Sequence, residues 1–176
     1  MLPNIYLIGP RACGKTTVGK CLADNLQLNF FDSDKELVRK AGCEISEYVR
    51  LHGWDAFRSL EVAVLEELSR KRGAVISCGG GIVVREENRV VLRNNFTVYI
   101  KTDVGILAGR LQLDPDHDQR PSLTGKSIVD EISDVLDERE SLYAGSASFL
   151  ADGAGTIDEV CNQILASYQS FSKGEK

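Results

Sequence analysis

The chain has 176 residues, of which 43% are hydrophobic, and this length and composition suit one domain with a single core. The net charge of -5 argues against a nucleic-acid-binding protein, which needs a basic surface to displace counterions from phosphates. The sequence has no Cys-x-x-Cys pair, no signal-peptide pattern and no long apolar stretch. We therefore expect a cytoplasmic protein with reduced thiols that binds neither nucleic acid nor a membrane.

Short apolar runs alternate with longer amphipathic stretches along the chain, which is typical of strand, helix and strand units around a parallel sheet. The candidate strands span residues 4–8, 29–32, 74–78, 97–101 and 148–151. We predict an α/β fold of the P-loop NTPase type, a three-layer sandwich in which helices flank a five-stranded parallel sheet. We assign residues 1–176 to a single domain and expect a monomer, because no long apolar helix face is left over.

The first candidate strand leads into a glycine-rich loop, GPRACGKT at residues 9–16, and an apolar helical pattern follows directly. The loop matches the phosphate-binding pattern G-x-x-x-x-G-K-[ST], in which backbone N–H groups and a helix N-terminus hold phosphates. Lys15 is expected to reach the β- and γ-phosphates from an exposed loop, and the Thr16 hydroxyl to ligate Mg²⁺. A chance glycine turn is the alternative, and the strand and helix on either side argue against it. The assigned ATP contacts are Ala12, Cys13, Gly14, Lys15, Thr16 and Thr17.

The second candidate strand ends in an Asp-Ser-Asp motif at residues 32–34. Many P-loop enzymes place a metal-binding acid after a later strand, but here that strand ends in Ser77, Cys78 and three glycines. Two carboxylates two residues apart can take different tasks at the carboxyl edge of a sheet. Helix capping is the common alternative role for an aspartate in this position.

Three further segments of the sequence have patterns that predict local structure or a ligand contact. The glycines at 79–81 suit a place where a ligand lies against bare backbone, although a plain turn that uses positive φ is the alternative. Residues 113–125, with two prolines, three aspartates and few apolar residues, are interpreted as a mobile loop. Thr156 and Glu159 form the pattern of a capping box, which predicts the start of the last helix.

Several motifs occur together in the order and spacing found in shikimate kinases. They are GPRACGKTT, the Asp-Ser-Asp motif, FRSLE at 57–61, the glycine run, Arg120-Pro121, and Glu138-Arg139 followed by Tyr143. The sequence resembles this family over about the whole chain, and GPRACGKTTVG with RPSLTGK resembles the type II enzyme of enteric bacteria. The resemblance implies transfer of the γ-phosphoryl group of ATP to the 3-hydroxyl of shikimate with Mg²⁺, a step of the shikimate pathway to aromatic amino acids.

The resemblance also implies how the acceptor is bound. It assigns Arg58 and Arg139 to the shikimate carboxylate and Asp34 to the ring hydroxyls, as an anchor or as a base. It assigns close backbone approach under the substrate to Gly79, Gly80 and Gly81. A guanidinium fork matches a carboxylate through paired hydrogen bonds, so the residue types fit these tasks. Arg58 also has the spacing to pair with Glu61 on one helix face, and we expect Glu61 to orient it.

For the donor half, we expect Mg²⁺ to be held by Thr16 and, through water, by Asp32, and Lys15 and Arg120 to neutralise charge on the transferring phosphoryl group. The resemblance makes residues 113–125 a lid that carries Arg120 and excludes water. Arg110 resembles the residue that stacks on adenine. The loop after Asp152 reads Gly-Ala-Gly, so adenine contacts there are expected from the backbone.

Three classes of protein are the alternatives to a shikimate kinase, namely another small-metabolite kinase, a GTPase switch and a module that binds ATP without turnover. Gluconate kinases and nucleoside monophosphate kinases share the phosphate loop, and gluconate also carries a carboxylate and hydroxyls. A GTPase switch needs a guanine-reading Asn-Lys-x-Asp segment, which the sequence does not contain. A module that binds ATP without turnover would not need Lys15, Asp32, Asp34 and Arg120 together.

Overall fold

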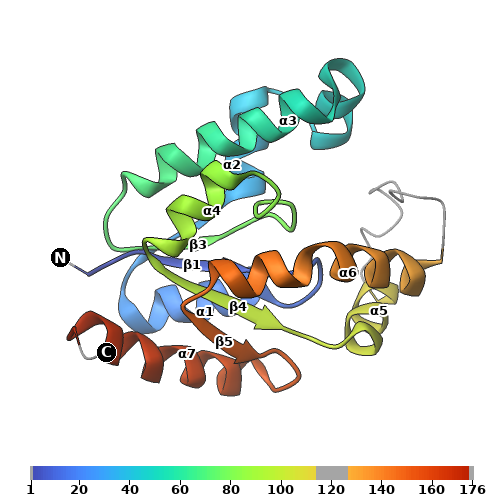
Figure 1. Cartoon of the computed structure of the whole chain (residues 1–176). Helices are drawn as coiled ribbons and strands as arrows, with labels where there is room; N and C mark the ends of the chain where they lie inside the picture. The colour runs from blue at the N-terminus through green and yellow to red at the C-terminus, as the bar shows by residue number, and fades with distance from the viewer. Residues whose placement is uncertain (1, 114–126, 175–176) are drawn as a thin grey trace.

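The computed structural model describes residues 2–113 and 127–174, and within them a five-stranded sheet forms the centre of the molecule (Figure 1). All neighbouring strands are parallel, and their order is β2-β3-β1-β4-β5. The strands are β1 (Ile5–Ile8), β2 (Asn29–Asp32), β3 (Ala74–Ser77), β4 (Phe96–Lys101) and β5 (Phe149–Asp152). The predicted fold class is confirmed, and each predicted strand end lies within one residue of the observed end.

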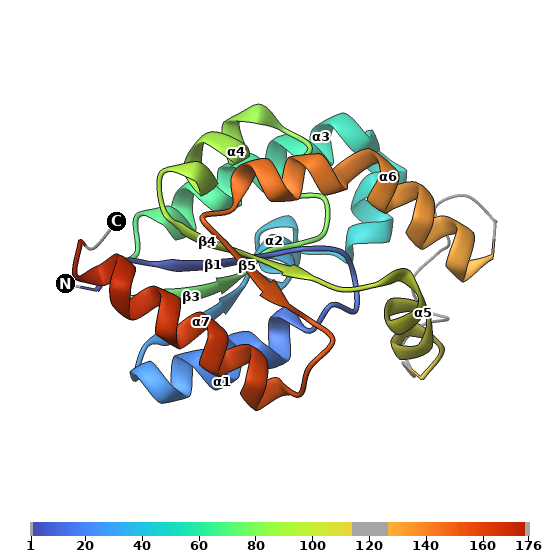
Figure 2. The same ribbon diagram turned by 60° about the horizontal axis from the view of Figure 1, so that its bottom comes forward.

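Helices cover both faces of the sheet and make three layers (Figure 2). One face carries α1 (Lys15–Leu26) and α7 (Ile157–Ser172). The other carries α2 (Ser33–Ala41), α3 (Ile45–Ser69), α4 (Glu86–Arg93) and much of α6 (Ile128–Ser146). The remaining helix, α5 (Val104–Gln112), lies beyond the carboxyl end of β4 beside the start of α6.

The apolar residues of the strands divide between two cores, one on each side of the sheet. Ile5 and Leu7 belong to the core under α1 and α7, whereas Tyr6 and Ile8 belong to the core under α2, α3 and α4. This alternation follows from the two-residue period of a strand. Both faces of β1 are buried, which explains why the central strands appear in the sequence as continuous apolar runs.

The carboxyl ends of β2, β3 and β1 lie side by side, because these three strands are neighbours in the sheet. The Asp-Ser-Asp motif follows β2, the glycine run follows β3 and the phosphate loop follows β1. Ligand sites of open α/β sheets form at this edge. The topology therefore brings three motifs that are far apart in the sequence to one place.

Two helices contain local features that matter for the site and for the sequence predictions. Helix α3 is interrupted at Gly53, whose φ of 80° and ψ of 168° are not helical, so a regular helix resumes at Trp54. The predicted capping box at the start of α7 is present, with Thr156 and Glu159 bonded reciprocally. Within the residues that the structure describes, no helix combines the length and apolar character needed to cross a membrane.

Candidate active site

The phosphate loop turns sharply between β1 and α1, and three residues adopt positive φ angles there. They are Gly9 at 143°, Ala12 at 64° and Gly14 at 102°. A Cβ at Gly9 would lie 3.0 Å from the Ile100 carbonyl oxygen, so this position needs glycine for space as well. Gly14 caps α1 without a side chain, which leaves the first N–H groups of the helix to an anion.

Lys15 is buried within this loop and not exposed, so the expectation of an exposed lysine is wrong. Its side chain is 9% exposed, and its ammonium donates hydrogen bonds to the carbonyl oxygens of Gly9 at 2.9 Å and Pro10 at 2.7 Å. The loop wraps around the lysine because β1 and α1 are joined by so few residues. The ammonium therefore lies inside the cradle where phosphates are expected to bind.

A carboxylate and two hydroxyls meet beside the start of α1. The Thr16 hydroxyl donates to Asp32 Oδ2 at 3.1 Å and lies 3.4 Å from the Ser77 hydroxyl. Asp32 also caps α2, since its Oδ1 accepts from the backbone N–H of Asp34 at 3.1 Å. The capping role and a place in the site thus hold together. Among the described residues there is no cluster of three His, Cys, Asp or Glu side chains, so any cation here would need oxygens from a ligand or water as well.

The glycine run after β3 leaves room for side chains of the protein itself. None of the three glycines has φ in the left-handed range, so a turn that requires positive φ is not the explanation. A Cβ on Gly79 would lie 2.3 Å from Asp34 Oδ1, and a Cβ on Gly81 would lie 2.0 Å from Arg58 Nη1. The missing side chains therefore allow Asp34 and Arg58 to lie against the backbone at the sheet edge.

Arg58 is held by an acid and two aromatic rings on α3. Its Nη1 is 2.5 Å from Glu61 Oε2, which is the pairing expected from the sequence, and Glu61 is only 4% exposed. The guanidinium carbon lies 5.4 Å from the Trp54 ring centroid and 5.1 Å from that of Phe57. Burial raises the pKa of Glu61, while the Arg58 charge opposes this shift. The rings and the carboxylate together restrict the direction in which Arg58 points.

Helix α6 contacts the same glycine run through two residues one turn apart. Arg139 Nη1 donates to the Gly80 carbonyl at 3.4 Å, and the Tyr143 hydroxyl donates to the same oxygen at 2.5 Å. Tyr143 is fully buried and stacks on Tyr99 with ring centroids 5.2 Å apart. Burial raises the pKa of Tyr143 to about 12, so its hydroxyl remains a proton donor at neutral pH. These contacts bring Arg139 within reach of the space beside Asp34 and Arg58.

Arg110 joins the phosphate loop to the loop after β5. Its Nη1 donates to the Ala12 carbonyl at 3.3 Å, and its Nη2 donates to the Gly153 carbonyl at 3.0 Å. A Cβ on Gly153 would lie 2.1 Å from Thr102 Oγ1, so a glycine is needed there. The guanidinium therefore lies between the two segments to which the sequence assigned the phosphates and the base.

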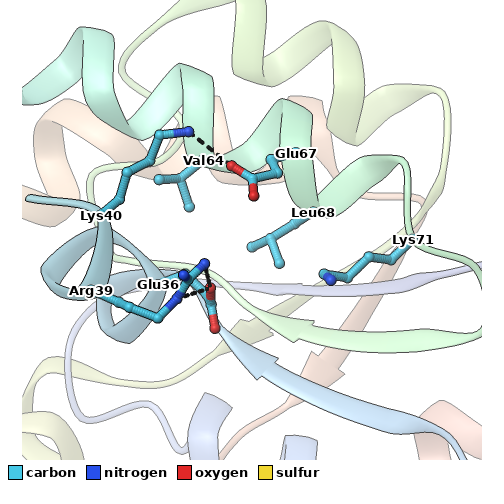
Figure 3. A pocket seen from close by; sticks show the side chains of 7 residues that line it. All are labelled: Glu36, Arg39, Lys40, Val64, Glu67, Leu68 and Lys71. Carbon is cyan, nitrogen blue, oxygen red and sulfur yellow. Dashed lines mark hydrogen bonds and ion pairs between the residues drawn. The ribbon is translucent and has the colours of Figure 1, made fainter.

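Two hollows elsewhere do not coincide with these residues. The hollow in Figure 3 lies between α2 and α3, has a volume of about 20 Å³ and is closed by ion pairs of Arg39 with Glu36 and of Lys40 with Glu67. That volume is close to that of a single water molecule, so we place no substrate there. A larger hollow of about 290 Å³ lies at the carboxyl ends of β4 and β5 and is lined by residues that include Lys101 and Ala154.

The comparisons with known proteins decide the family. A family model described as shikimate kinase matches residues 11–169. The chain belongs to the shikimate kinase family. It is 43% identical to a shikimate kinase of Nitratidesulfovibrio vulgaris, over 93% of this chain and 94% of that protein. It is also 43% identical to shikimate kinase 2 of an Enterobacter species, over 95% and 96% of the two chains. The chain is thus a kinase of this family, as the sequence motifs indicated.

Solved structures of the family share the fold. A shikimate kinase from Acinetobacter baumannii, solved in complex with shikimate, has a TM-score of 0.89 and 34% identity, covering 97% of this chain and 95% of that one. A gluconokinase from Sinorhizobium meliloti has a TM-score of 0.64 and 18% identity, over 98% and 94% of the two chains. At that identity the second likeness concerns the fold alone. The likeness to the gluconokinase therefore does not support gluconate as the acceptor.

Most of the site residues expected of a shikimate kinase come together at one sheet edge. Asp34, Arg58 and Arg139 surround the glycine run, and Lys15, Thr16 and Asp32 follow β1 and β2 beside it. Arg110 lies at the far side of the phosphate loop. Arg120 and the predicted lid from residue 114 onward lie outside the described residues, and their assignment stays a prediction.

Three polar residues at this edge received no role from the sequence. The Ser33 hydroxyl accepts from the backbone N–H of Gly79 at 2.8 Å, Ser77 lies beside Thr16, and Tyr143 binds Gly80. The position of Tyr143, four residues after Arg139, places both on one helix face and was an available signal. Ser33 and Ser77 are separated from their partners by tens of residues. Only the pairing of the strands reveals those contacts.

Proposed function

We propose that this chain transfers the γ-phosphoryl group of ATP to the 3-hydroxyl of shikimate, with Mg²⁺ as cofactor. The observation that carries the proposal is the meeting, at one sheet edge, of a phosphate loop with a cluster of acidic and basic side chains. Asp34, Arg58 and Arg139 all lie against the glycine run. Shikimate carries one carboxylate and three hydroxyls, which is the set of groups that these side chains can bind.

On the acceptor side, Arg58 and Arg139 bind the shikimate carboxylate and Asp34 accepts a hydrogen bond from the 3-hydroxyl. Arg58 is already oriented by Glu61, so little side-chain entropy is lost when it binds the substrate. Gly79 and Gly81 leave room for the side chains of Asp34 and Arg58, and Gly80 keeps the role of close backbone approach to the ring. Membership of the shikimate kinase family supports this choice of acceptor.

On the donor side, the phosphates lie along the N–H groups of residues 12–17 and Lys15 contacts the β- and γ-phosphates. Thr16 and Asp32 offer a hydroxyl and a carboxylate oxygen to Mg²⁺, and both are hard ligands of the kind that this ion prefers. When bound, Mg²⁺ neutralises charge on the β- and γ-phosphate oxygens. Arg110 stacks on the adenine, and Arg120 supplies a second cation to the transferring group.

In the transfer step, the bond between the γ-phosphorus and the bridging oxygen of ADP breaks, and a bond from the 3-hydroxyl oxygen forms. The transition state is largely dissociative, so the attacking oxygen gains little charge before the bond forms. Asp34 then acts mainly by orienting the hydroxyl, and it is the nearest acceptor for the released proton. Lys15 stabilises charge that develops on the phosphate oxygens.

We propose that the enzyme acts as a monomer in the cytoplasm, because the sequence leaves no long apolar helix face over for a partner. Light scattering of the purified protein at micromolar concentration measures its mass directly. A mass of about twice 19.3 kDa would contradict the monomer.

The substrate assignment is tested by measuring ADP release with ATP, Mg²⁺ and one acceptor at a time. Shikimate, gluconate and nucleoside monophosphates are compared by kcat/KM. We expect shikimate to exceed the others by about 1,000-fold or more, because a site whose half-buried charged groups lack their partners rejects other acceptors. Equal or better turnover of gluconate would contradict the proposal.

A further inference from the structure

The middle residue of the Asp-Ser-Asp motif makes a contact that no proposed role explains. Ser33 is 4% exposed, and its hydroxyl accepts a hydrogen bond from the backbone N–H of Gly79 at 2.8 Å. Ser33 is the first residue of α2, and Gly79 is the first glycine after β3. The bond therefore ties the start of a helix to the start of the glycine run.

This contact lies just beyond the paired ends of β2 and β3. The last aligned pair of residues in the two strands is Asp32 with Ser77. After that pair one strand turns into α2 and the other into the glycine run, so backbone pairing stops. Beyond the last backbone pair of β2 and β3, the hydrogen bond from the Gly79 N–H to the Ser33 hydroxyl still joins the two segments.

Gly79 contacts two consecutive residues of the motif. Its N–H binds Ser33, and a Cβ built on it would lie 2.3 Å from Asp34 Oδ1. Asp34 is also linked to the other aspartate, since its backbone N–H donates to Asp32 Oδ1 at 3.1 Å. The backbone that carries the Asp34 side chain is thus held at two points, by Asp32 and by the bond between Ser33 and Gly79.

We propose that Ser33 is a positioning residue, which holds the Asp34 carboxylate against the glycine run and at a fixed place relative to the pair of Thr16 and Asp32. The proposal rests on the proposed function, in which Asp34 orients the acceptor hydroxyl and Thr16 with Asp32 serves the phosphate end. Removal of the hydroxyl leaves the buried Gly79 N–H without its acceptor and frees the first turn of α2 to shift. A small shift of the acceptor is enough to slow an in-line transfer.

The test compares Ser33→Ala, Ser33→Thr and the wild type in the full chain, with shikimate and ATP varied separately. We expect Ser33→Ala to raise the KM for shikimate by about tenfold or more, while the KM for ATP changes by less than about twofold. Ser33→Thr keeps a hydroxyl acceptor and should recover most of the loss. A purely structural role would lower the active fraction and leave both KM values unchanged.

Ser146→Ala is the matched control. Ser146 is also a buried serine, and its hydroxyl donates to the Leu142 carbonyl at 2.7 Å within α6. This variant loses a buried hydroxyl without touching the Asp-Ser-Asp motif, so both of its KM values and its kcat should match the wild type. If Ser33→Ala does not fold, Ser33→Cys keeps the size of the side chain with a weaker acceptor and should show the same selective loss.

Two results would overturn the positioning role of Ser33 while the wild type remains active. One is a folded Ser33→Ala variant with wild-type kcat and shikimate KM. The other is a loss that is equal for shikimate and ATP and is not recovered in folded Ser33→Thr. A wild-type protein that does not phosphorylate shikimate would instead contradict the proposed function, and the role of Ser33 would fall with it.

Discussion

The phosphate loop and the proposed acceptor pocket lie side by side at one sheet edge, but they are built in different ways. By acceptor pocket we mean Asp34, Arg58 and Arg139 together with the glycine run against which they lie. The phosphate loop is a single continuous segment whose backbone is shaped by Gly9 and Gly14, with Lys15 folded inside it. The acceptor pocket takes side chains from α2, α3 and α6, which are fixed by contacts with one another and with the glycine run. A backbone site can be identified from a motif, whereas a side-chain site depends on the assembled fold.

Replacing Lys15 tests the phosphate loop and should have the largest effect. We expect Lys15→Ala to lower kcat by about 100- to 1,000-fold, because it removes a preorganised cation from the transition state. The variant also loses buried bonds to the carbonyls of Gly9 and Pro10, so urea unfolding should show a loss of about 1–2 kcal/mol. Lys20→Ala, an exposed lysine on the same helix, is the control. A folded Lys15→Ala protein with near-normal kcat would refute the assigned role.

Replacing Arg139 tests the acceptor pocket. Arg139→Ala should raise the KM for shikimate by about 30-fold or more, because a bound carboxylate left without one guanidinium loses a charge-assisted pair. The KM for ATP should stay within about twofold, since Arg139 contacts the glycine run and not the phosphate loop. Arg70→Ala, an exposed arginine at the end of α3, should change neither constant. Equal losses for both substrates would remove Arg139 from the acceptor site.

Glu61, which pairs with Arg58, should make the stability of the folded protein depend on pH. Burial raises its pKa above the ordinary value of 4.5, and the folded state therefore binds this proton more tightly than the unfolded chain. The resulting stabilisation is complete below the unfolded pKa and is lost as pH rises through the folded pKa. Glu61→Gln has no such dependence. Urea unfolding at about pH 4 and about pH 8 should show that the stability of the wild type relative to Glu61→Gln decreases as pH rises.

This pH prediction concerns a difference between two proteins, so the titration of carboxylates that do not interact with Glu61 cancels. A wild-type stability that stays constant relative to Glu61→Gln, or that increases with pH, would contradict it. The phosphate loop is tested instead through activity, by Lys15→Ala. The unfolding measurement needs no substrate, so it probes the acceptor pocket independently of catalysis.

Replacing Arg110 should have the smallest effect, and the effect should be on the KM for ATP. Arg110→Ala should raise the KM for ATP about fivefold with little change in kcat, because stacking on a base and two bonds to backbone carbonyls are lost. The KM for GTP should rise by a similar factor, since the Gly-Ala-Gly loop after Asp152 has no side chain that reads the base. A loss confined to ATP would show that Arg110 recognises adenine specifically.

The sequence predicted the fold and the phosphate loop well, since both depend on local patterns. The alternation of apolar runs located each strand of the described residues, and the loop motif by itself predicts a glycine-rich turn between a strand and a helix. The burial of Lys15 was not predicted, because exposure depends on how tightly the loop wraps around its own side chain. A motif names the residues of a loop without giving the depth at which each side chain lies.

The acceptor pocket was predicted only in part, for a physical reason that the glycine run illustrates. The sequence suggested bare backbone under a ligand, but the nearest atoms to Gly79 and Gly81 belong to Asp34 and Arg58. The contact between Ser33 and Gly79 joins residues 46 positions apart, and no local pattern marks it. Such contacts are set by the strand order, so they become visible only when the sheet is assembled.

The most direct test of the central claim is a phosphorus NMR measurement of the product. The purified chain is supplied with ATP, Mg²⁺ and shikimate, and the phosphate resonances of the mixture are followed together with ADP. The account predicts one molecule of shikimate 3-phosphate for each ADP, and no ADP when shikimate is left out. ADP formed together with free inorganic phosphate in place of the ester, or phosphate on a different hydroxyl of shikimate, would contradict it.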